Sequence, residues 1–174
     1  DLFFANRFTQ LKFSDLLRYP LYECNGKEVP LEKELQYLKN YFDLQRLRKD
    51  DNYIVTFDCA IEADHQTLAP LLLVTFVENA FKHISHFTDQ PNEIRIAIHR
   101  ERNILKMNVF NTTENSSHPD GNAKNNGGIG LKNVKRRLEL IYGREYSLNI
   151  RESEHEFEVN LTIPLHETQL PDYR

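Results

Sequence analysis

The chain has 174 residues, of which 40% are hydrophobic, and a formal net charge of −4 at pH 7. This length supports one hydrophobic core with a small extension, and the acidic balance excludes the strong positive field typical of nucleic-acid-binding proteins. No apolar run reaches the roughly 18 residues of a membrane-spanning helix, and the first residues lack the layout of a signal peptide. Cys24 and Cys59 have neither metal-binding nor redox spacing, which is typical of a reducing cytosol. We therefore expect a soluble chain.

The first part of the sequence is typical of helices. Hydrophobic residues recur at helical spacing over residues 4–11, before a break at Pro20. A second helical stripe consists of Leu31, Leu35, Leu38 and Phe42, and it is widened by Tyr37, Tyr41 and Leu44. A helix with so wide an apolar surface is expected to pack against more than one neighbour.

The second part alternates in the manner of strands. Period-two patterns cover residues 53–60, 94–100, 104–110, 146–151 and 157–165. Helical patterns cover residues 68–86 and 131–142. This order predicts an α+β fold with helices on one face of a mixed, mostly antiparallel sheet, preceded by a helical segment.

The helix predicted over residues 68–86 carries polar groups among its hydrophobes. Its apolar stripe is Leu73, Val77, Ala80, Phe81 and Ile84, and its polar side is Thr75, Glu78, Asn79, Lys82 and His86, with His83 at the edge. An ordinary amphipathic helix explains this pattern, but Asn79 is a poor helix former in mid-helix. Its amide oxygen beside the Glu78 carboxylate offers donors that Mg²⁺ accepts, and Lys82 can meet a phosphate.

A glycine cluster precedes the last helix. Gly127, Gly128 and Gly130 permit close approach of a ligand, and free amides at the helix start make an anion site. The nearby positive charges are Lys132, Lys135, Arg136 and Arg137. A flexible turn that opens a helix with a solvated basic face explains the cluster equally well. The pattern is neither a dinucleotide fingerprint nor a Walker loop.

The two segments together resemble a known family. PLLLVTFVENAFKHI is similar to the N-box, and GGIGLKNVKRRLELIYG to the G-box, of the GHKL ATPase superfamily, and specifically of LytS-type sensor histidine kinases. The stretch SDLLRYPLYECNGKEVPLEKELQYLKNYFDLQRLR resembles the segment that joins the phosphoacceptor helices to the ATP-binding domain. The resemblance covers roughly residues 14 to 165.

The resemblance implies a Bergerat-type α/β sandwich that binds ATP and Mg²⁺. Its parts would be a helical segment at 1–48, left from the dimerisation and phosphoacceptor region, an ATP-binding catalytic domain at 49–168 and a tail at 169–174. The polar run at 112–126 becomes an ATP lid that opens and closes.

The resemblance also implies roles for single residues. Asn79 would ligate Mg²⁺, and Glu78 would orient water or the attacking group. The residues expected near the phosphates are Lys82 and His83, those at the lid hinge are Gly128 and Gly130, and the backbone amide expected to face phosphate is that of Leu131.

Two departures from the family pattern concern the phosphoacceptor and the adenine box. The first histidine is His65, outside any His-Phe-x-Phe-Asn motif, so the acceptor histidine is expected upstream of Asp1. In place of the Asp-x-Gly-x-Gly box stands NTTEN, with Asn111 at the aspartate position. An Asn oxygen still accepts a hydrogen bond from an adenine amino group, without the charge assistance of a carboxylate.

The resulting hypothesis is the cytoplasmic catalytic portion of a bacterial sensor histidine kinase. The full-length protein would phosphorylate a histidine and pass the group to a response regulator, while this chain alone would bind nucleotide without labelling itself. A homodimer through residues 1–20 is expected, no nucleic acid, and attachment to an inner membrane only through other parts of the full-length protein. Two alternatives stay open: a degenerate GHKL domain that serves as a dimerisation or docking module without ATP turnover, and a serine-phosphorylating GHKL kinase.

Overall fold

The computed structural model describes residues 16–24, 26–61, 65–114 and 129–167. The helix predicted over residues 4–11, Gly128, most of the polar run and the tail lie outside these ranges.

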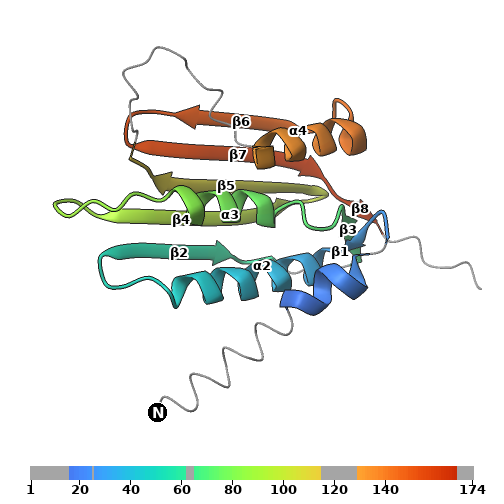
Figure 1. Cartoon of the computed structure of the whole chain (residues 1–174). Coiled ribbons are helices and arrows are strands. Elements are labelled where there is room, and N and C mark those ends of the chain that lie inside the picture. Colours follow the sequence, from blue (N-terminus) through green and yellow to red (C-terminus); the bar gives the residue numbers. More distant parts are fainter. Residues whose placement is uncertain (1–15, 25, 62–64, 115–128, 168–174) are drawn as a thin grey trace, which may run out of the picture.

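The described chain forms three α-helices, a π-helical turn and eight strands (Figure 1). They are a π-helical turn η1 (Tyr19–Glu23), β1 (Val29–Pro30), α2 (Leu31–Arg46), β2 (Tyr53–Cys59), β3 (Gln66–Leu68), α3 (Val74–His83), β4 (Asn92–Glu101), β5 (Ile104–Thr112), α4 (Ile129–Tyr142), β6 (Ser147–Glu152), β7 (Glu156–Pro164) and β8 (His166–Glu167). All five strands predicted from alternation are present, within two residues of the expected ends.

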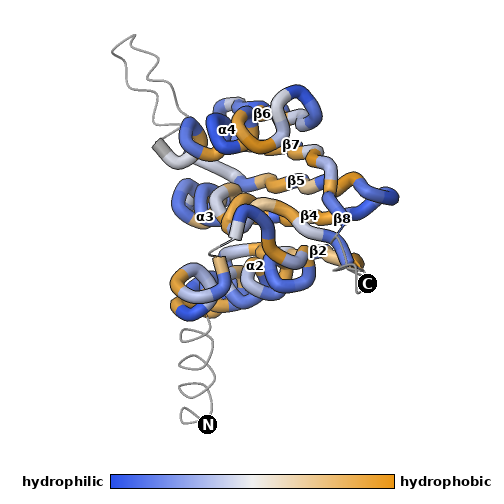
Figure 2. Tube along the Cα trace, turned by 90° about the vertical axis from the view of Figure 1, so that its right-hand side faces the viewer, coloured by the Kyte–Doolittle hydropathy of each residue, from blue (hydrophilic) through white to orange (hydrophobic). Residues whose placement is uncertain are grey.

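The main sheet has five strands in the order β2-β4-β5-β7-β6. β2 pairs with β4 in parallel, with Val55 opposite Ile94, and the other neighbours are antiparallel. Figure 2 shows α2, α3 and α4 as one layer and the strands of the main sheet as a second. The predicted α+β fold, with helices on one face of a mixed, mostly antiparallel sheet, is confirmed.

The core lies between the helices and the sheet. Alternate residues of each central strand point into it, because strand side chains alternate between the two faces. Fully buried side chains on the strands are Ile94, Ile96, Ile98, Leu105, Leu161 and Ile163, and on the helices Leu31, Leu38, Phe42, Phe76, Val77 and Leu138. α2 therefore shares one core with the sheet, as its wide apolar surface predicts. The domain division after residue 48 stays a prediction.

The opposite face of the main sheet is largely polar. Asn108 donates hydrogen bonds to Glu158 and Asn160, and the Arg95 guanidinium lies 3.9 Å from the centre of the Phe110 ring. Among the described residues, α2, α3 and α4 cover only the other face (Figure 2).

A second, three-stranded sheet in the order β1-β3-β8 was not predicted. β3 pairs with β1 and β8, both of two residues. Glu28, just before β1, accepts a hydrogen bond from Thr67 of β3 and contacts His166 of β8. The small sheet thus joins segments from both ends of the described chain.

Two predicted helix boundaries were wrong. The helix predicted over residues 68–86 spans only Val74–His83. It begins late because Pro70 disfavours helical backbone at the residue before it and because Leu71 has a φ of 55°. The break predicted at Pro20 falls instead after Glu23, since Pro20 occupies the first turn of η1, where its missing N–H group is not needed.

Candidate functional site

Helix α3 orients its polar residues as the sequence predicts. The whole predicted apolar stripe is buried against the sheet, so that Glu78, Lys82 and His83 are exposed and Asn79 is half-buried. The helix contacts β5 and both neighbouring helices. The four polar side chains therefore share one edge of a helix that the core holds firmly.

The environment of α3 changes the proton affinity of two of these side chains. Partial desolvation by neighbouring protein atoms raises the pKa of the Glu78 carboxyl, whereas partial desolvation and then the charge of Lys82 lower the pKa of His83. Burial and then the charge of Glu78 raise the pKa values of Tyr37 and Tyr41 on α2 to about 12. A carboxyl with a raised pKa is a better proton acceptor near neutral pH than an ordinary one.

Asn111 lies on β5, on the face that the helices cover. It is fully buried, and it pairs with Ile94 of β4 and Phe157 of β7. Its Nδ2 donates to the Thr112 carbonyl at 3.0 Å, while its Oδ1 is buried and has no hydrogen-bond partner within the described ranges. Buried side-chain oxygens are rarely left in this state, so Oδ1 is a candidate acceptor for a ligand.

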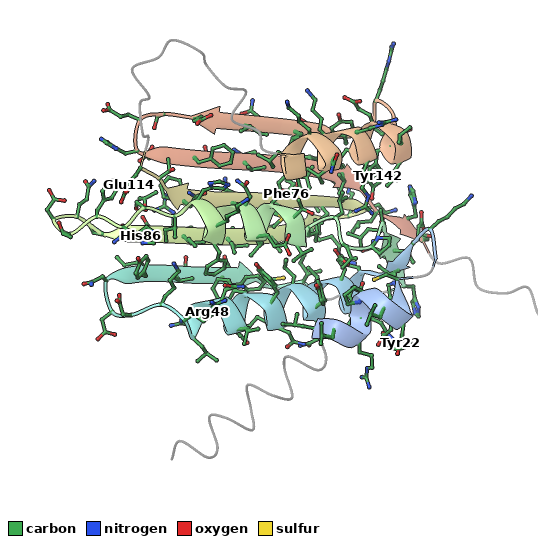
Figure 3. All side chains as sticks on the ribbon, viewed as in Figure 1. Tyr22, Arg48, Phe76, His86, Glu114 and Tyr142 are labelled. Atoms are coloured by element: carbon green, nitrogen blue, oxygen red, sulfur yellow. The ribbon has the colours of Figure 1, made fainter. Side chains whose placement is uncertain are left out.

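The end of α3 is tied to the end of β5. The Ser85 amide donates to the Thr112 carbonyl at 2.9 Å, and the Ser85 hydroxyl donates to the Thr112 hydroxyl. The His86 amide donates to the Glu114 carboxylate, and Figure 3 shows both residues at this end of the sheet. Asn111 therefore lies near the end of α3 that carries Lys82.

The first turn of α4 lies beside the first turn of α3. A Cβ atom on Gly130 would meet only the Thr75 methyl group, at 3.9 Å. The Leu131 side chain is buried, so only its backbone is a candidate for contact with a ligand. Amides in the first turn of a helix have no acceptor within the helix and form a natural anion site. Gly128 lies outside the described residues.

One of the predicted positive charges has a different role. Arg137 donates to the backbone carbonyls of Pro70 and Leu71, so it stabilises the segment before α3. Lys132, Lys135 and Arg136 are exposed on α4.

The prediction from sequence also missed Glu34, whose carboxylate accepts hydrogen bonds from the backbone amides of Leu71, Leu72 and Leu73. The available signal was its position: Glu34 lies between Leu31 and Leu38 on the apolar stripe of α2.

Comparison with known proteins assigns the family. The sequence model of the GHKL domain matches residues 66–164. The chain belongs to the GHKL domain family. The model of the histidine kinase family matches residues 5–53, before the GHKL domain. The resemblance predicted from the sequence is therefore confirmed, and membership of the GHKL family implies nucleotide binding.

Curated relatives of this GHKL domain are sensor proteins. The chain is 28% identical over 164 residues to the sensor protein LytS of Staphylococcus saprophyticus. The matched region covers 90% of this chain and 28% of that protein. It is 29% identical over 141 residues to the sensor histidine kinase YesM of Bacillus subtilis, covering 78% of this chain and 24% of that protein. The chain thus spans about a quarter of the length of these relatives.

Solved structures share the fold. The catalytic domain of the histidine kinase ThkA superimposes with a TM-score of 0.53 at 16% identity, covering 79% of this chain and 93% of that one. The histidine kinase domain of the blue-light activated kinase EL346 from Erythrobacter litoralis gives a TM-score of 0.55 at 19% identity, covering 89% and 70%. Within the described residues, none of the helices has the length and hydropathy needed to span a membrane.

Proposed function

We propose that this GHKL domain binds ATP with Mg²⁺ and forms the catalytic portion of a two-component sensor histidine kinase. The observation that carries the proposal is Asn111 Oδ1, a buried acceptor without a partner among the described residues, on the helix-covered face of the sheet near the end of α3. The family match supports the same reading.

Asn111 supports recognition of adenine. Its Nδ2 is engaged by the Thr112 carbonyl, which fixes the orientation of the amide and leaves Oδ1 as an acceptor only. The exocyclic amino group of adenine is a donor and satisfies such an acceptor. Guanine carries a carbonyl oxygen at the corresponding position, which would leave both oxygens unsatisfied and disfavour binding.

The phosphate end of the site would be formed by α3 and α4. Asn79 would give Mg²⁺ one amide oxygen, and phosphate oxygens and water would complete the octahedral set. The residues present fit such a site, because the amide oxygen of half-buried Asn79 and the neighbouring Glu78 carboxylate are hard oxygen donors of the kind that Mg²⁺ accepts. Lys82 and His83 would lie near the phosphates, and the start of α4 at Gly130 and Leu131 would bind them through backbone amides.

Glu78 would orient the group that attacks the terminal phosphate. Bound ATP supplies the phosphoryl group, and Mg²⁺ neutralises its charge. Partial desolvation raises the pKa of Glu78, which suits a carboxylate that accepts a hydrogen bond from an incoming imidazole. The acceptor histidine would lie outside residues 1–174, and the phosphoryl group would pass from it to a response regulator.

The remaining parts of the proposal concern assembly and location. We place the domain in the cytoplasm, joined to a bacterial inner membrane through other parts of the full-length protein. A homodimer through residues 1–20 is supported by exposed apolar side chains near that segment, at Leu17, Leu21 and Tyr22. Light scattering that gives a monomeric mass at high protein concentration would count against the dimer.

Calorimetric titration with a non-hydrolysable ATP analogue tests the site. We expect Asn79→Ala to weaken binding in the presence of Mg²⁺ by about tenfold or more, which corresponds to loss of a metal ligand. Binding without Mg²⁺ should change little. Asn108→Ala, on the opposite face of the sheet, is the matched control and should bind as the wild type does. An Asn79→Ala variant that titrates like the wild type would overturn the assignment.

A degenerate GHKL domain that serves as a docking module is the second candidate. The observation in its favour is Asn111 in place of the aspartate, with no glycine in the four residues that follow. The same titration decides between them, because a docking module gives no heat with ATP, ADP or GTP at any Mg²⁺ concentration.

A further inference from the structure

Glu34 is a carboxylate in the hydrophobic core. It lies on α2 between Leu31 and Leu38, and its exposed fraction is 0%. Acidic side chains are almost never so deeply buried unless they are paired or hydrogen-bonded. Burial raises the pKa of Glu34, and the hydrogen bonds from Leu71, Tyr19, Leu73 and Leu72 oppose that rise.

Glu34 caps helix α3 from a different helix. Its Oε1 accepts from the amides of Leu72 at 3.1 Å and Leu73 at 3.4 Å, and its Oε2 accepts from the Leu71 amide at 3.0 Å. Leu73 is the N-cap of α3 and makes no side-chain cap of its own. The amides before a helix otherwise lack acceptors, and negative charge at this end interacts favourably with the helix dipole.

The segment that Glu34 holds is conformationally unusual. Leu71 has a φ of 55°, in the left-handed region that a branched residue rarely adopts. Glu34 holds its amide, while Arg137 of α4 donates to its carbonyl at 3.5 Å and to the Pro70 carbonyl at 2.8 Å. Side chains from α2 and α4 therefore hold both the amide and the carbonyl of this residue, which lets an unfavourable backbone conformation persist.

The fourth donor to Glu34 comes from η1. The Tyr19 hydroxyl of η1 donates to Glu34 Oε2 at 2.9 Å, the same oxygen that accepts from the Leu71 amide. Tyr19 is 5% exposed and stacks on Tyr37 of α2. Burial and then the Glu34 charge raise the pKa of Tyr19 well above its usual value, so the hydroxyl stays protonated and remains a donor.

We propose that Glu34 is a positioning residue for the nucleotide site. Its hydrogen bond with Tyr19 makes the position of α3, and with it that of Asn79, depend on the position of η1. A displacement of η1 removes one donor from a buried carboxylate, and that oxygen also holds the Leu71 amide. The position of α3 then changes too, because the same carboxylate caps the start of this helix. The effect on Asn79 rests on the proposed nucleotide function.

Tyr19→Phe is the variant that tests this connection, since it keeps the ring and removes only the hydroxyl. We expect hydrogen exchange of the Leu72 and Leu73 amides to accelerate about tenfold relative to that of the Ile96 amide in the core of the sheet. We also expect the affinity for the Mg²⁺ complex of an ATP analogue to fall about three- to tenfold. Tyr146→Phe, which removes the hydroxyl of a half-buried tyrosine after α4, should change both by less than about twofold.

A second variant separates positioning from general stability. Glu34→Gln replaces one acceptor oxygen by the side-chain amide NH2 group, which cannot accept a hydrogen bond from a backbone N–H group. On the Glu34→Gln background, Tyr19→Phe should lose most of its effect on both readouts, because the two residues act through one contact. Equal acceleration of the Ile96, Leu72 and Leu73 amides, or full additivity of the two substitutions, would overturn the proposal.

The experiment also distinguishes this inference from the proposed function. A wild-type chain that binds no nucleotide overturns the proposed function, and the exchange ratio then decides the Tyr19–Glu34 connection alone. If the wild type binds the analogue and Tyr19→Phe binds it equally well, the proposed function stands and the inference is wrong.

Discussion

Asn108 and Asn111 are three residues apart on β5, so their side chains lie on opposite faces of the sheet. Asn108 donates to Glu158 and Asn160 on the polar face. Asn111 is buried on the helix-covered face, where its Oδ1 has no partner among the described residues. The same residue type on one strand is therefore satisfied at one position and left with a buried acceptor at the other.

The unsatisfied acceptor leads to a prediction for Asn111→Asp. In the free protein the buried carboxylate lacks a donor, so the free energy of unfolding should fall by about 1–3 kcal/mol. With nucleotide bound, the adenine amino group would donate to a charged acceptor, and such hydrogen bonds are roughly twice as strong. We therefore expect ADP to bind about three- to tenfold more tightly, while urea unfolding shows a less stable free protein.

Asn111→Leu and Asn108→Asp are the two controls. The leucine removes the acceptor and should weaken ADP binding about tenfold, with no gain for GDP. The aspartate at position 108 lies on the polar face and should leave ADP binding unchanged. ADP affinity that is equal in the wild type, Asn111→Asp and Asn111→Leu would show that Oδ1 does not meet the base.

The position of Asn111 was predictable, whereas its environment was not. Alternation along β5 and along residues 157–165 predicts strands, and the matching elements β5 and β7 follow within two residues. The apolar stripe of α3 is buried as its spacing predicts. These features are local, because they depend only on the repeat of one strand or one helix.

The features that sequence missed depend on contacts between distant residues. β1 and β8 have two residues each, too few for a periodic signal, and β8 pairs with β3 across about a hundred residues of sequence. The late start of α3 depends on Glu34 and Arg137, which hold the backbone at Leu71 from two other helices. A charged residue on an apolar stripe was a signal for Glu34, but the backbone amides that donate to it lie 37 to 39 positions away.

Leu38 provides a test of whether α2 folds with the rest of the domain. Its side chain is fully buried in the shared core. We expect Leu38→Ala to lower the free energy of unfolding by about 2–5 kcal/mol in a single cooperative transition, measured by urea unfolding followed by circular dichroism. Leu47→Ala, just after α2 and 61% exposed in the wild type, should change it by less than about 0.5 kcal/mol. Two separate transitions would instead support a domain boundary near residue 48.

Glu28 should make the contribution of the small sheet to stability depend on pH. Burial raises the pKa of its carboxyl, but hydrogen bonds with Thr67 and His166 and the charge of His166 together lower the pKa below the usual 4.5. A lowered pKa means that the folded state favours the charged form, so the contribution is present above pH 4.5 and is lost as the pH falls through the folded pKa.

The corresponding variant is Glu28→Gln. Because about a third of the side chain is exposed, we expect a loss of only about 0.5–1 kcal/mol at neutral pH, shrinking toward zero when the pH is below the folded pKa. Thr67→Val removes one of the lowering hydrogen bonds, so its acid loss of stability should begin at a higher pH. Urea unfolding across the acid range measures both, and an equal loss for Glu28→Gln at every pH would contradict the expectation.

The β4–β5 hairpin contains a residue whose replacement should stabilise the fold. Glu101 pairs with Ile104, so the turn consists of Arg102 and Asn103, and Arg102 has a φ of 54° whereas Asn103 is outside the positive region. A two-residue turn of this type prefers glycine at its first position. Left-handed backbone costs a non-glycine residue roughly 1–2 kcal/mol, and glycine loses roughly 0.5–1 kcal/mol through the greater freedom of the unfolded chain. Arg102→Gly should therefore raise the free energy of unfolding by about 0.5–1 kcal/mol and Tm by about 1–4 °C.

The neighbouring substitution Asn103→Gly is the control for that gain. It relieves no left-handed strain, and it removes the Oδ1 atom that accepts a hydrogen bond from Gln66 at 3.0 Å. The backbone carbonyls of Arg102 and Asn103, which accept from Gln66 and Leu165, are kept in both variants. Calorimetric scanning should therefore give a higher Tm for Arg102→Gly and a lower one for Asn103→Gly. A lower Tm for both would mean that the Arg102 side chain stabilises the hairpin by more than its backbone conformation costs.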